Sequence, residues 1–402
     1  MAPALNALIL AALHAAKSPT PFDPGFNISA VASVAQALPS HSWEFGTATE
    51  ALLELNSPLL SVFGPSPFPV PTLEPADVPA LAYAQAKIVI GTGANGLSDG
   101  DGAVGDPASL GVGAVMLGKT DASFATAAAS EIEYIVGEAP RWVNGAISQR
   151  VDVAELWADF MFMAPPFIAY YAADSHNASL LETAYRQCGL QREVLLFLSN
   201  SSTPSRPDTS ASSGRWSHIV GPQSADPGLW STGNGWAAMG MARVLATITK
   251  APVARSPAAP WRAAALADLT AWIKEIVDGA RGSPPDGGLL RNYLDDTVSA
   301  HGFGEISGTS MLAAVAYRMV VLAPHEFPAA TYVPWADSVR ATLGGLDAAG
   351  LPHVTASGIV TPAVNPLGWQ DTTPFTAGSP EGNNFVVMLY AAWRDCVYAG
   401  LC

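Results

Sequence analysis

Helix-length apolar segments follow one another along the whole chain, separated by loops rich in Gly, Pro, Ser and Asp. In some of these segments the apolar residues recur at helical spacing on a single face, as Trp261, Leu269 and Ile276 do. Others, such as Met311 to Leu322, are apolar nearly all round, and a helix without a polar face must be buried on every side. Two such populations predict two concentric layers of helices.

The predicted helices come in pairs, and strand signals are scarce. Brief β-like runs occur at Lys87–Ile90 and Tyr332–Pro334. About a dozen paired helices predict an all-α fold, an (α/α)6 toroid of six hairpins that forms a single domain over residues 1–402. A long helical solenoid is the alternative, but no fixed-period repeat supports it. The predicted helices span residues 3–16, 29–37, 44–55, 77–90, 107–117, 122–137, 152–173, 177–199, 234–249, 259–279, 305–323, 334–344 and 380–398.

Two loops stand out by their composition. Residues 91–102 are rich in Gly, Ser and Asp, but they lack both the Lys-Ser/Thr ending of a phosphate loop and the closing Glu of an EF-hand. We therefore interpret them as a connector. Residues 201–214 are a Ser/Thr/Pro/Asp segment, which predicts a surface loop.

Charge and residue patterns limit the partners of the chain. The net charge is −15, and no cluster of Lys and Arg with interleaved aromatic residues occurs, so we expect no nucleic-acid partner. No apolar run reaches membrane-spanning length, so we expect no membrane partner. The seven His residues are scattered and no nucleotide-binding fingerprint occurs, so we expect no metal and no cofactor. We expect a monomer or a weak homo-oligomer.

Cysteines and glycosylation sequons favour an exported, extracellular glycoprotein. Cys396 and Cys402 are close enough in sequence to form a disulfide, which leaves Cys188 free. The first apolar segment, Ala4–Ala16, lacks the basic start of a secretory signal, and we interpret it as a helix. Three sequons begin at Asn27, Asn177 and Asn200.

One carboxylate lies in an unusually apolar stretch. Asp159 stands between Leu156-Trp157-Ala158 and Phe160-Met161-Phe162-Met163. Burial among such side chains disfavours the charged form of an acid and raises its pKa, which suits a proton donor near neutral pH. An Asp that caps or pairs within a helical core is an equally good interpretation of the composition.

Four other clusters of polar and aromatic residues lie at predicted loop-to-helix junctions. The clusters at Asp106-Pro107 and at Glu305 with Glu381 can be ordinary helix starts with an acid or a Pro in the first turn, and the Gly228–Trp236 cluster can be a helix start with Trp packed in the core. The two Trp around the Gly-Asn-Gly turn also suit the stacking and hydrogen bonding of a sugar. The clusters are Asp106-Pro107, Gly145–Arg150, Gly228–Trp236, and the pair Gly304–Thr309 with Ser379–Asn384.

In order along the chain, these motifs resemble those of the six-hairpin glycosidases. The motifs are Gly-x-x-Ser-x-Arg, Leu-Trp-x-Asp-x-x-x-Met-x-x-Pro-Phe, Trp-x-x-Gly-Asn-Gly-Trp and Glu-x-Ser-Gly-Thr, and the likeness covers roughly residues 40–395. The most similar group is glycoside hydrolase families 88 and 105, the unsaturated uronyl hydrolases, and the Ser-Pro-Glu-Gly segment is like that of fungal members.

The resemblance implies an unusual hydrolysis. Such enzymes act on oligosaccharides left by polysaccharide lyases, of the rhamnogalacturonan, pectin or glucuronan type, which begin with a 4,5-unsaturated uronic acid. The family's Asp protonates C4 and helps water to attack C5, and the hemiketal that forms opens and releases the next sugar. Asp159 corresponds to that residue, and Asp106 to the family's second active-site Asp.

The resemblance also assigns a substrate pocket to this chain. Arg150 is the expected partner of the uronate carboxylate, with His218 and Arg215 as further candidates, because guanidinium groups pair well with carboxylates. Gln149 stands where many family members have His, and Trp43 matches the aromatic N-terminal part of the pocket loosely. The predicted substrate-binding residues are Trp43, Gln149, Arg150, Trp157, Met163, His218, Trp230, Asn234, Trp236 and Glu305.

Three other functions are compatible with the same motifs. A saturated β-glucuronidase needs a second acid, with Asp106 or Glu305 joining Asp159. A uronate polysaccharide lyase needs a Tyr or His base. A non-catalytic sugar-binding protein needs neither.

Overall fold

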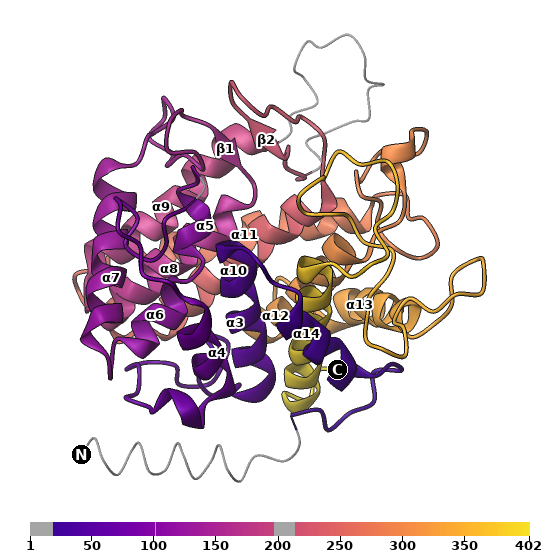
Figure 1. Cartoon of the computed structure of the whole chain (residues 1–402), viewed down its shortest axis with the longest axis horizontal. Coiled ribbons are helices and arrows are strands. Elements are labelled where there is room, and N and C mark those ends of the chain that lie inside the picture. Colours follow the sequence, from indigo (N-terminus) through magenta and orange to yellow (C-terminus); the bar gives the residue numbers. More distant parts are fainter. Residues whose placement is uncertain (1–18, 101, 197–213) are drawn as a thin grey trace.

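The computed structural model describes residues 19–100, 102–196 and 214–402 of the chain. Within them, helices form two layers around a common centre, as the sequence predicts (Figure 1). Six helices form a closed inner ring in which each contacts the next and the last returns to the first. The inner helices are α3 (Ser42–Asn56), α6 (Gly111–Leu117), α8 (Phe160–Asp174), α10 (Ser231–Lys250), α12 (Ile306–Leu322) and α14 (Pro380–Tyr398).

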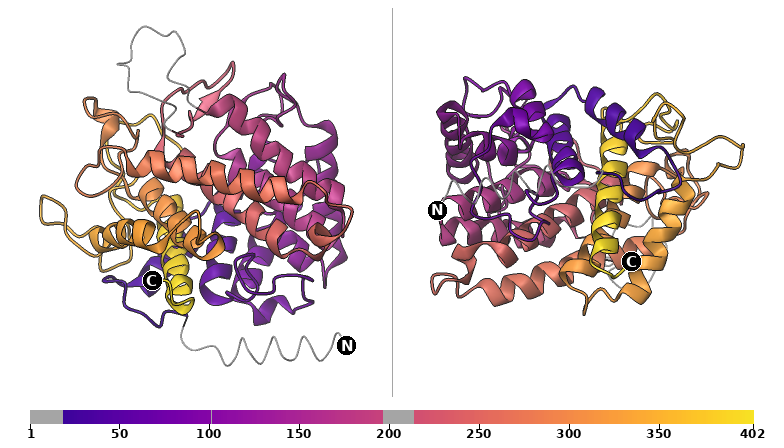
Figure 2. Two further views of the ribbon diagram at one scale, coloured as in Figure 1. Left: turned by 180° about the vertical axis from the view of Figure 1, so that it is seen from behind. Right: turned by 90° about the horizontal axis from the view of Figure 1, so that it is seen from below.

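A second set of helices packs on the outside of this ring. Each outer helix contacts an inner one, and α11 is seen on the rear surface in Figure 2. The outer helices are α2 (Ile28–Ala37), α4 (Pro79–Lys87), α7 (Ala122–Glu133), α9 (Ala178–Leu195), α11 (Arg262–Arg281) and α13 (Ala329–Leu343). Alternation of outer and inner helices along the chain makes the fold an (α/α)6 toroid.

Burial distinguishes the two layers. Every residue from Ile306 to Val320 on α12 is buried, whereas α11 buries one face that includes Leu269, Ile273 and Ile276. The apolar content of each segment therefore predicts its layer, because a helix surrounded by other helices has no wet face.

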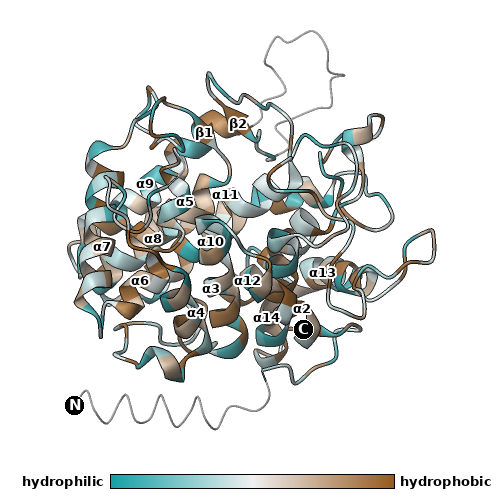
Figure 3. Ribbon diagram, in the orientation of Figure 1, coloured by the Kyte–Doolittle hydropathy of each residue, from teal (hydrophilic) through white to brown (hydrophobic). Residues whose placement is uncertain are grey.

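Two predicted helices are wrong at their starts. The segment 152–173 does not begin as a helix: residues 152–159 form a loop and the short strand β1 (Leu156–Trp157), and α8 begins at Phe160. β1 pairs antiparallel with β2 (Ile219–Val220), whose hydrophobic character stands out in Figure 3. The segment 107–117 divides into α5 (Gly105–Ala108) and α6.

Neither β-like run forms a strand. Tyr332–Pro334 lies inside α13, and Lys87 ends α4. The expected helix 122–137 ends in a π-helical turn at Tyr134–Glu138. Short 3-10 turns occur at Pro75–Asp77, Pro252–Arg255 and Ala300–Gly302.

Several predicted surface features can be placed. Cys396, near the end of α14, forms a disulfide with Cys402 beyond the helix, and Cys188 is a buried free thiol. Asn27 and Asn177 are exposed, and each caps the helix that follows it. Asn200, the predicted helix 3–16 and nearly all of the predicted loop 201–214 lie outside the described residues. No helix of the described part combines the length and apolar character of a membrane span.

Candidate active site

Four of the inner helices, together with the short helix α5, begin around one cavity, which has a volume of about 290 Å³. Trp43 lies in the first turn of α3, Asp106 in that of α5 and Glu381 in that of α14, while Asp159 and Trp230 immediately precede α8 and α10. Because the N-terminus of a helix carries partial positive charge, this end of the ring favours acidic groups. Of the predicted site residues, the cavity is lined by Trp43, Asp106, Gln149, Arg150, Trp157, Asp159, Met163, His218 and Trp230.

Asp159 faces a histidine as well as apolar groups. Its Oδ2 lies 3.3 Å from Nε2 of His218, whose Nδ1 is 2.9 Å from Oδ2 of Asp226. The hydroxyl of Tyr293 donates to the same Asp226 oxygen at 2.7 Å. Burial opposes a charge on His218, but the carboxylates of Asp159 and Asp226 outweigh burial and raise the pKa of the imidazole. Asp159 therefore has an ion-pair partner, which is one of the two interpretations that its composition allows.

The β1–β2 register explains how these two side chains meet. Trp157 pairs with Ile219, and Ala158 donates its N–H to the carbonyl of His218. Asp159 follows the end of β1 and His218 precedes β2, so antiparallel pairing places them side by side. Beside them, the Trp230 ring lies with its centroid 4.3 Å from that of His218.

The second carboxyl, Asp106, is held by an amide. Its Oδ1 accepts a hydrogen bond from Nε2 of Gln149 at 2.8 Å. Burial raises the pKa of Asp106 to about 6; the Gln149 bond opposes this shift and the Asp159 charge adds to it. The Asp106 side chain therefore changes from carboxylic acid to carboxylate as the pH rises through about 6.

Among the described residues, Arg150 is the arginine whose side chain lines the cavity. Its guanidinium lies 4.8 Å from the centre of the Trp157 ring, and its Nε is 3.9 Å from Glu155. The Nε1 of Trp157 donates to the same Glu155 carboxylate at 2.8 Å. The guanidinium is therefore oriented by an aromatic face and an acid, while 28% of the Arg150 side chain stays exposed.

Three predicted substrate-binding residues do not line the cavity. Trp236 is fully buried between Phe162 and Phe385. The Asn234 side chain binds the backbone of Trp216 and Trp230. The Gly-Asn-Gly-Trp pattern suggested both residues, but Trp236 packs in the core of the ring and Asn234 ties the backbone at Trp216 to the start of α10.

Glu305 is the third of these residues, and it is a helix cap. It accepts hydrogen bonds from the N–H groups of Ser307 and Gly308 and from the hydroxyl of Ser231. Arg215, a further candidate, donates to Ser283 and does not line the cavity.

The cavity wall also contains residues that were not predicted from the sequence. Glu381 lines the cavity, and its Oε1 accepts a hydrogen bond from Nε1 of Trp43 at 3.1 Å. The His41 ring stacks on Trp43 with centroids 4.6 Å apart. The acid in the first turn of α14 was visible in the sequence, but nothing there separates it from Glu305. Pro366, Leu367 and Trp369 also line the cavity and come from the long loop before α14.

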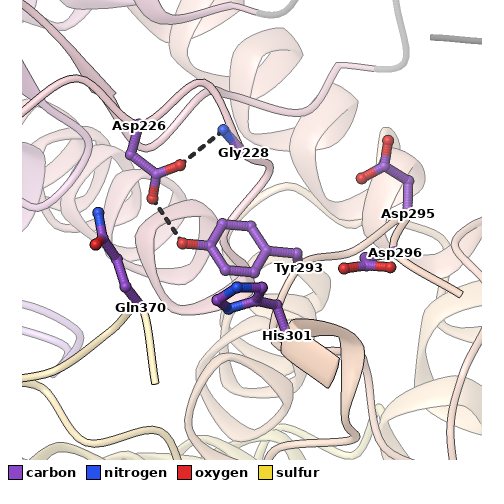
Figure 4. A pocket seen from close by; sticks show the side chains of 7 residues that line it. All are labelled: Asp226, Gly228, Tyr293, Asp295, Asp296, His301 and Gln370. Atoms are coloured by element: carbon purple, nitrogen blue, oxygen red, sulfur yellow. Dashed lines mark hydrogen bonds between the residues drawn. The ribbon is translucent and has the colours of Figure 1, made fainter. Parts of the chain in front are cut away.

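A larger hollow of about 540 Å³, drawn in Figure 4, is lined by Asp226, whose carboxylate also contacts His218. Asp226 and Tyr293 line it and bond each other, and Gln370 reaches it from the loop that carries Trp369 (Figure 4). Asp226 thus joins the hollow to His218 in the first cavity. In the described part of the chain, no group of three or more His, Cys, Asp and Glu side chains is arranged to hold a metal ion.

Comparison with known proteins agrees with this architecture. The model of Glycosyl Hydrolase Family 88 matches residues 116–315, just under half of the chain, which include Asp159 and His218 but not Asp106 or Glu381. No curated protein matches the sequence.

Solved structures share the fold at low identity. A glycosyl hydrolase family 88 protein from Bacteroides vulgatus has a TM-score of 0.65 at 15% identity, over 92% of this chain and 97% of that one. A possible family 105 member from Salmonella enterica has a TM-score of 0.65 at 13% identity, over 92% and 94%. An unsaturated glucuronyl hydrolase specific for heparin has a TM-score of 0.61 at 10% identity, over 93% and 97%.

Proposed function

We propose that the chain is a six-hairpin glycosidase that removes a 4,5-unsaturated uronic acid from the non-reducing end of lyase-generated oligosaccharides; the partial match to Glycosyl Hydrolase Family 88 and the shared fold support this. The observation that carries the proposal is the contact between Asp159 and His218 at the cavity wall. A relative of this fold is named an unsaturated glucuronyl hydrolase, which supports the substrate class.

The Asp159–His218 contact suits the protonation of a vinyl ether. One proton between Oδ2 and Nε2 gives either a carboxylate with an imidazolium or a carboxylic acid with a neutral imidazole. In the second form Asp159 delivers the proton to C4 of the sugar. Water then adds to C5 and returns a proton to Asp159, which restores the starting state.

The hydration accounts for bond cleavage without a second acid. Addition of H to C4 and OH to C5 makes a hemiketal, and its opening leaves C1 as an unstable hemiacetal that expels the next sugar as an alcohol. Arg150 is placed to hold the uronate carboxylate, because its guanidinium is oriented and partly exposed in the cavity. We place the leaving saccharide in the hollow beyond Asp226.

The test is an absorbance assay with lyase-generated oligosaccharides. The wild type should abolish the absorbance of the unsaturated uronate, since hydration removes its double bond. Asp159→Asn should lose at least about 100-fold in kcat, in keeping with loss of acid–base catalysis. Retention of activity by this variant would refute the role of Asp159.

A conventional glycoside hydrolase is the second candidate, and the acids of the cavity favour it. Asp106, Asp159 and Glu381 all line the cavity, so a proton donor and a second carboxylate are both present, although Glu305 is not among them. Release of reducing sugar from a saturated uronide, with no change in absorbance, would select this function. A rise in absorbance on intact polymer would identify a lyase.

A further inference from the structure

We propose that Glu381 is a substrate-binding residue whose Oε2 contacts an oxygen of the sugar held beside Asp159. The side chain is 3% exposed and lines the cavity. Its Oε1 accepts from Trp43, but Oε2 has no hydrogen-bond partner among the described residues. A buried polar atom left without a partner costs about 1–3 kcal/mol. Because Glu381 lines the cavity, a sugar that enters there can supply the missing partner.

The neighbours of Glu381 decide what kind of contact it makes. Three acids on neighbouring elements act on its charge: Asp159 precedes α8, Glu44 lies on α3 and Glu305 precedes α12. The third helix packed on α14, α2, has no titratable side chain. His41 lies 3.5 Å from Glu44 and binds that acid instead. Burial and these acids raise the pKa of Glu381 well above its ordinary value.

This shift favours the protonated form of Glu381, in which the side chain donates a hydrogen bond to the sugar. This matters for an anionic sugar, because an ionised Glu381 would repel a uronate carboxylate. The inference deepens the proposed function and rests on it only in that the cavity must bind a sugar.

The competing explanation is that Glu381 only orients Trp43. Three variants separate the two roles. Glu381→Gln keeps the size, the acceptor for Trp43 and a donor, but does not titrate. Glu381→Met removes both polar atoms. Trp43→Phe removes the donor to Oε1 and keeps an aromatic ring.

The experiment measures the dissociation constant of D-glucuronate by calorimetry between pH 5 and 9, in the Asp159→Asn background so that no turnover occurs. With Glu381 present, we expect affinity to fall at least about tenfold more across this range than in the Glu381→Gln variant, since ionisation of the acid sets like charges together and the amide stays neutral. Glu381→Met should bind more weakly than the parent, and should weaken binding further when added to Trp43→Phe.

Equal pH dependence with Glu381 and in the Glu381→Gln variant would overturn the inference. So would a Glu381→Met effect that disappears in the Trp43→Phe background, because that result assigns Glu381 to Trp43 alone. Glu131→Gln is the matched control and should leave the pH dependence of binding unchanged: burial raises the pKa of Glu131 to about 7, but it lies on α7 and does not line the cavity. The absorbance assay above is independent, so either result can fail alone.

Discussion

At the scale of single residues, His218 depends on Asp226 for its orientation. The Asp226 carboxylate binds Nδ1 and so directs Nε2 towards Asp159. Asp226→Asn should lower kcat by about 100-fold, the usual consequence of a misplaced catalytic group, with a smaller change in KM. Steady-state kinetics with the unsaturated oligosaccharide measures both. Tyr293→Phe is the control, since it keeps the contact of Asp226 with His218 and should lose much less; equal losses in the two variants would contradict this role.

The ionisation of Asp106, which lines the cavity, makes the stability of the fold depend on pH. Its folded pKa of about 6 is raised above the value in the unfolded chain, so the folded state binds the proton more tightly. The protonated Asp106 side chain makes its full favourable contribution to the free energy of unfolding at low pH. This contribution is lost as the pH rises through about 6. Asp106→Asn removes the ionisation and keeps an acceptor for Gln149. We expect the variant to be more stable than the wild type by about 1–2 kcal/mol at pH 8 but not at pH 4.

Denaturant titrations of both proteins at the two pH values test this expectation. A wild type that is as stable as Asp106→Asn at pH 8 would show that the Asp106 carboxylate is well solvated. The same variant should lose activity, because the cavity then lacks its second titrating acid.

At the scale of elements, the start of α12 is held by one buried cap. Glu305 binds two N–H groups of α12 and Ser231 of α10. Glu305→Ala should lower the free energy of unfolding by about 2–4 kcal/mol, because it leaves buried donors without a partner. Glu305→Gln keeps an acceptor and should cost less. KM should stay nearly unchanged in both, since Glu305 does not line the cavity; a large rise in KM would restore it to the binding site.

At the scale of the whole molecule, a buried ionic network ties the inner ring together. Glu54 of α3 binds both Arg243 of α10 and Arg318 of α12, and Arg318 reaches Asp395 of α14 at 2.5 Å. Glu54→Gln leaves two buried guanidinium groups short of negative charge and should cost about 3–5 kcal/mol. Chemical denaturation measures the loss.

The exposed pair Glu182–Arg186 is the control, and Glu182→Gln should change the free energy of unfolding by less than about 0.5 kcal/mol.

Sequence reasoning predicted the layers because hydrophobicity records burial directly. The apolar α12 and the amphipathic α11 reach their expected layers for this reason. It failed at 152–159, where the same apolar pattern is satisfied by a short strand and a loop beside the cavity. Local pattern reports that a residue is buried, but does not report which backbone buries it.

The sequence by itself determined the toroid, the apolar stretch around Asp159 and the group of residues near it in the chain, such as Gln149, Arg150 and Trp157. Tertiary structure alone decided which distant side chains meet there. It brings His218 to Asp159 through the pairing of β1 and β2, brings Glu381 to Trp43 from the opposite end of the chain, and turns Trp236 into the core. The physical reason is that several helix starts have a similar composition, so the sequence does not tell which of their side chains point into the cavity. Closure of the ring fixes the rotation of each helix through packing between residues that are far apart in the chain.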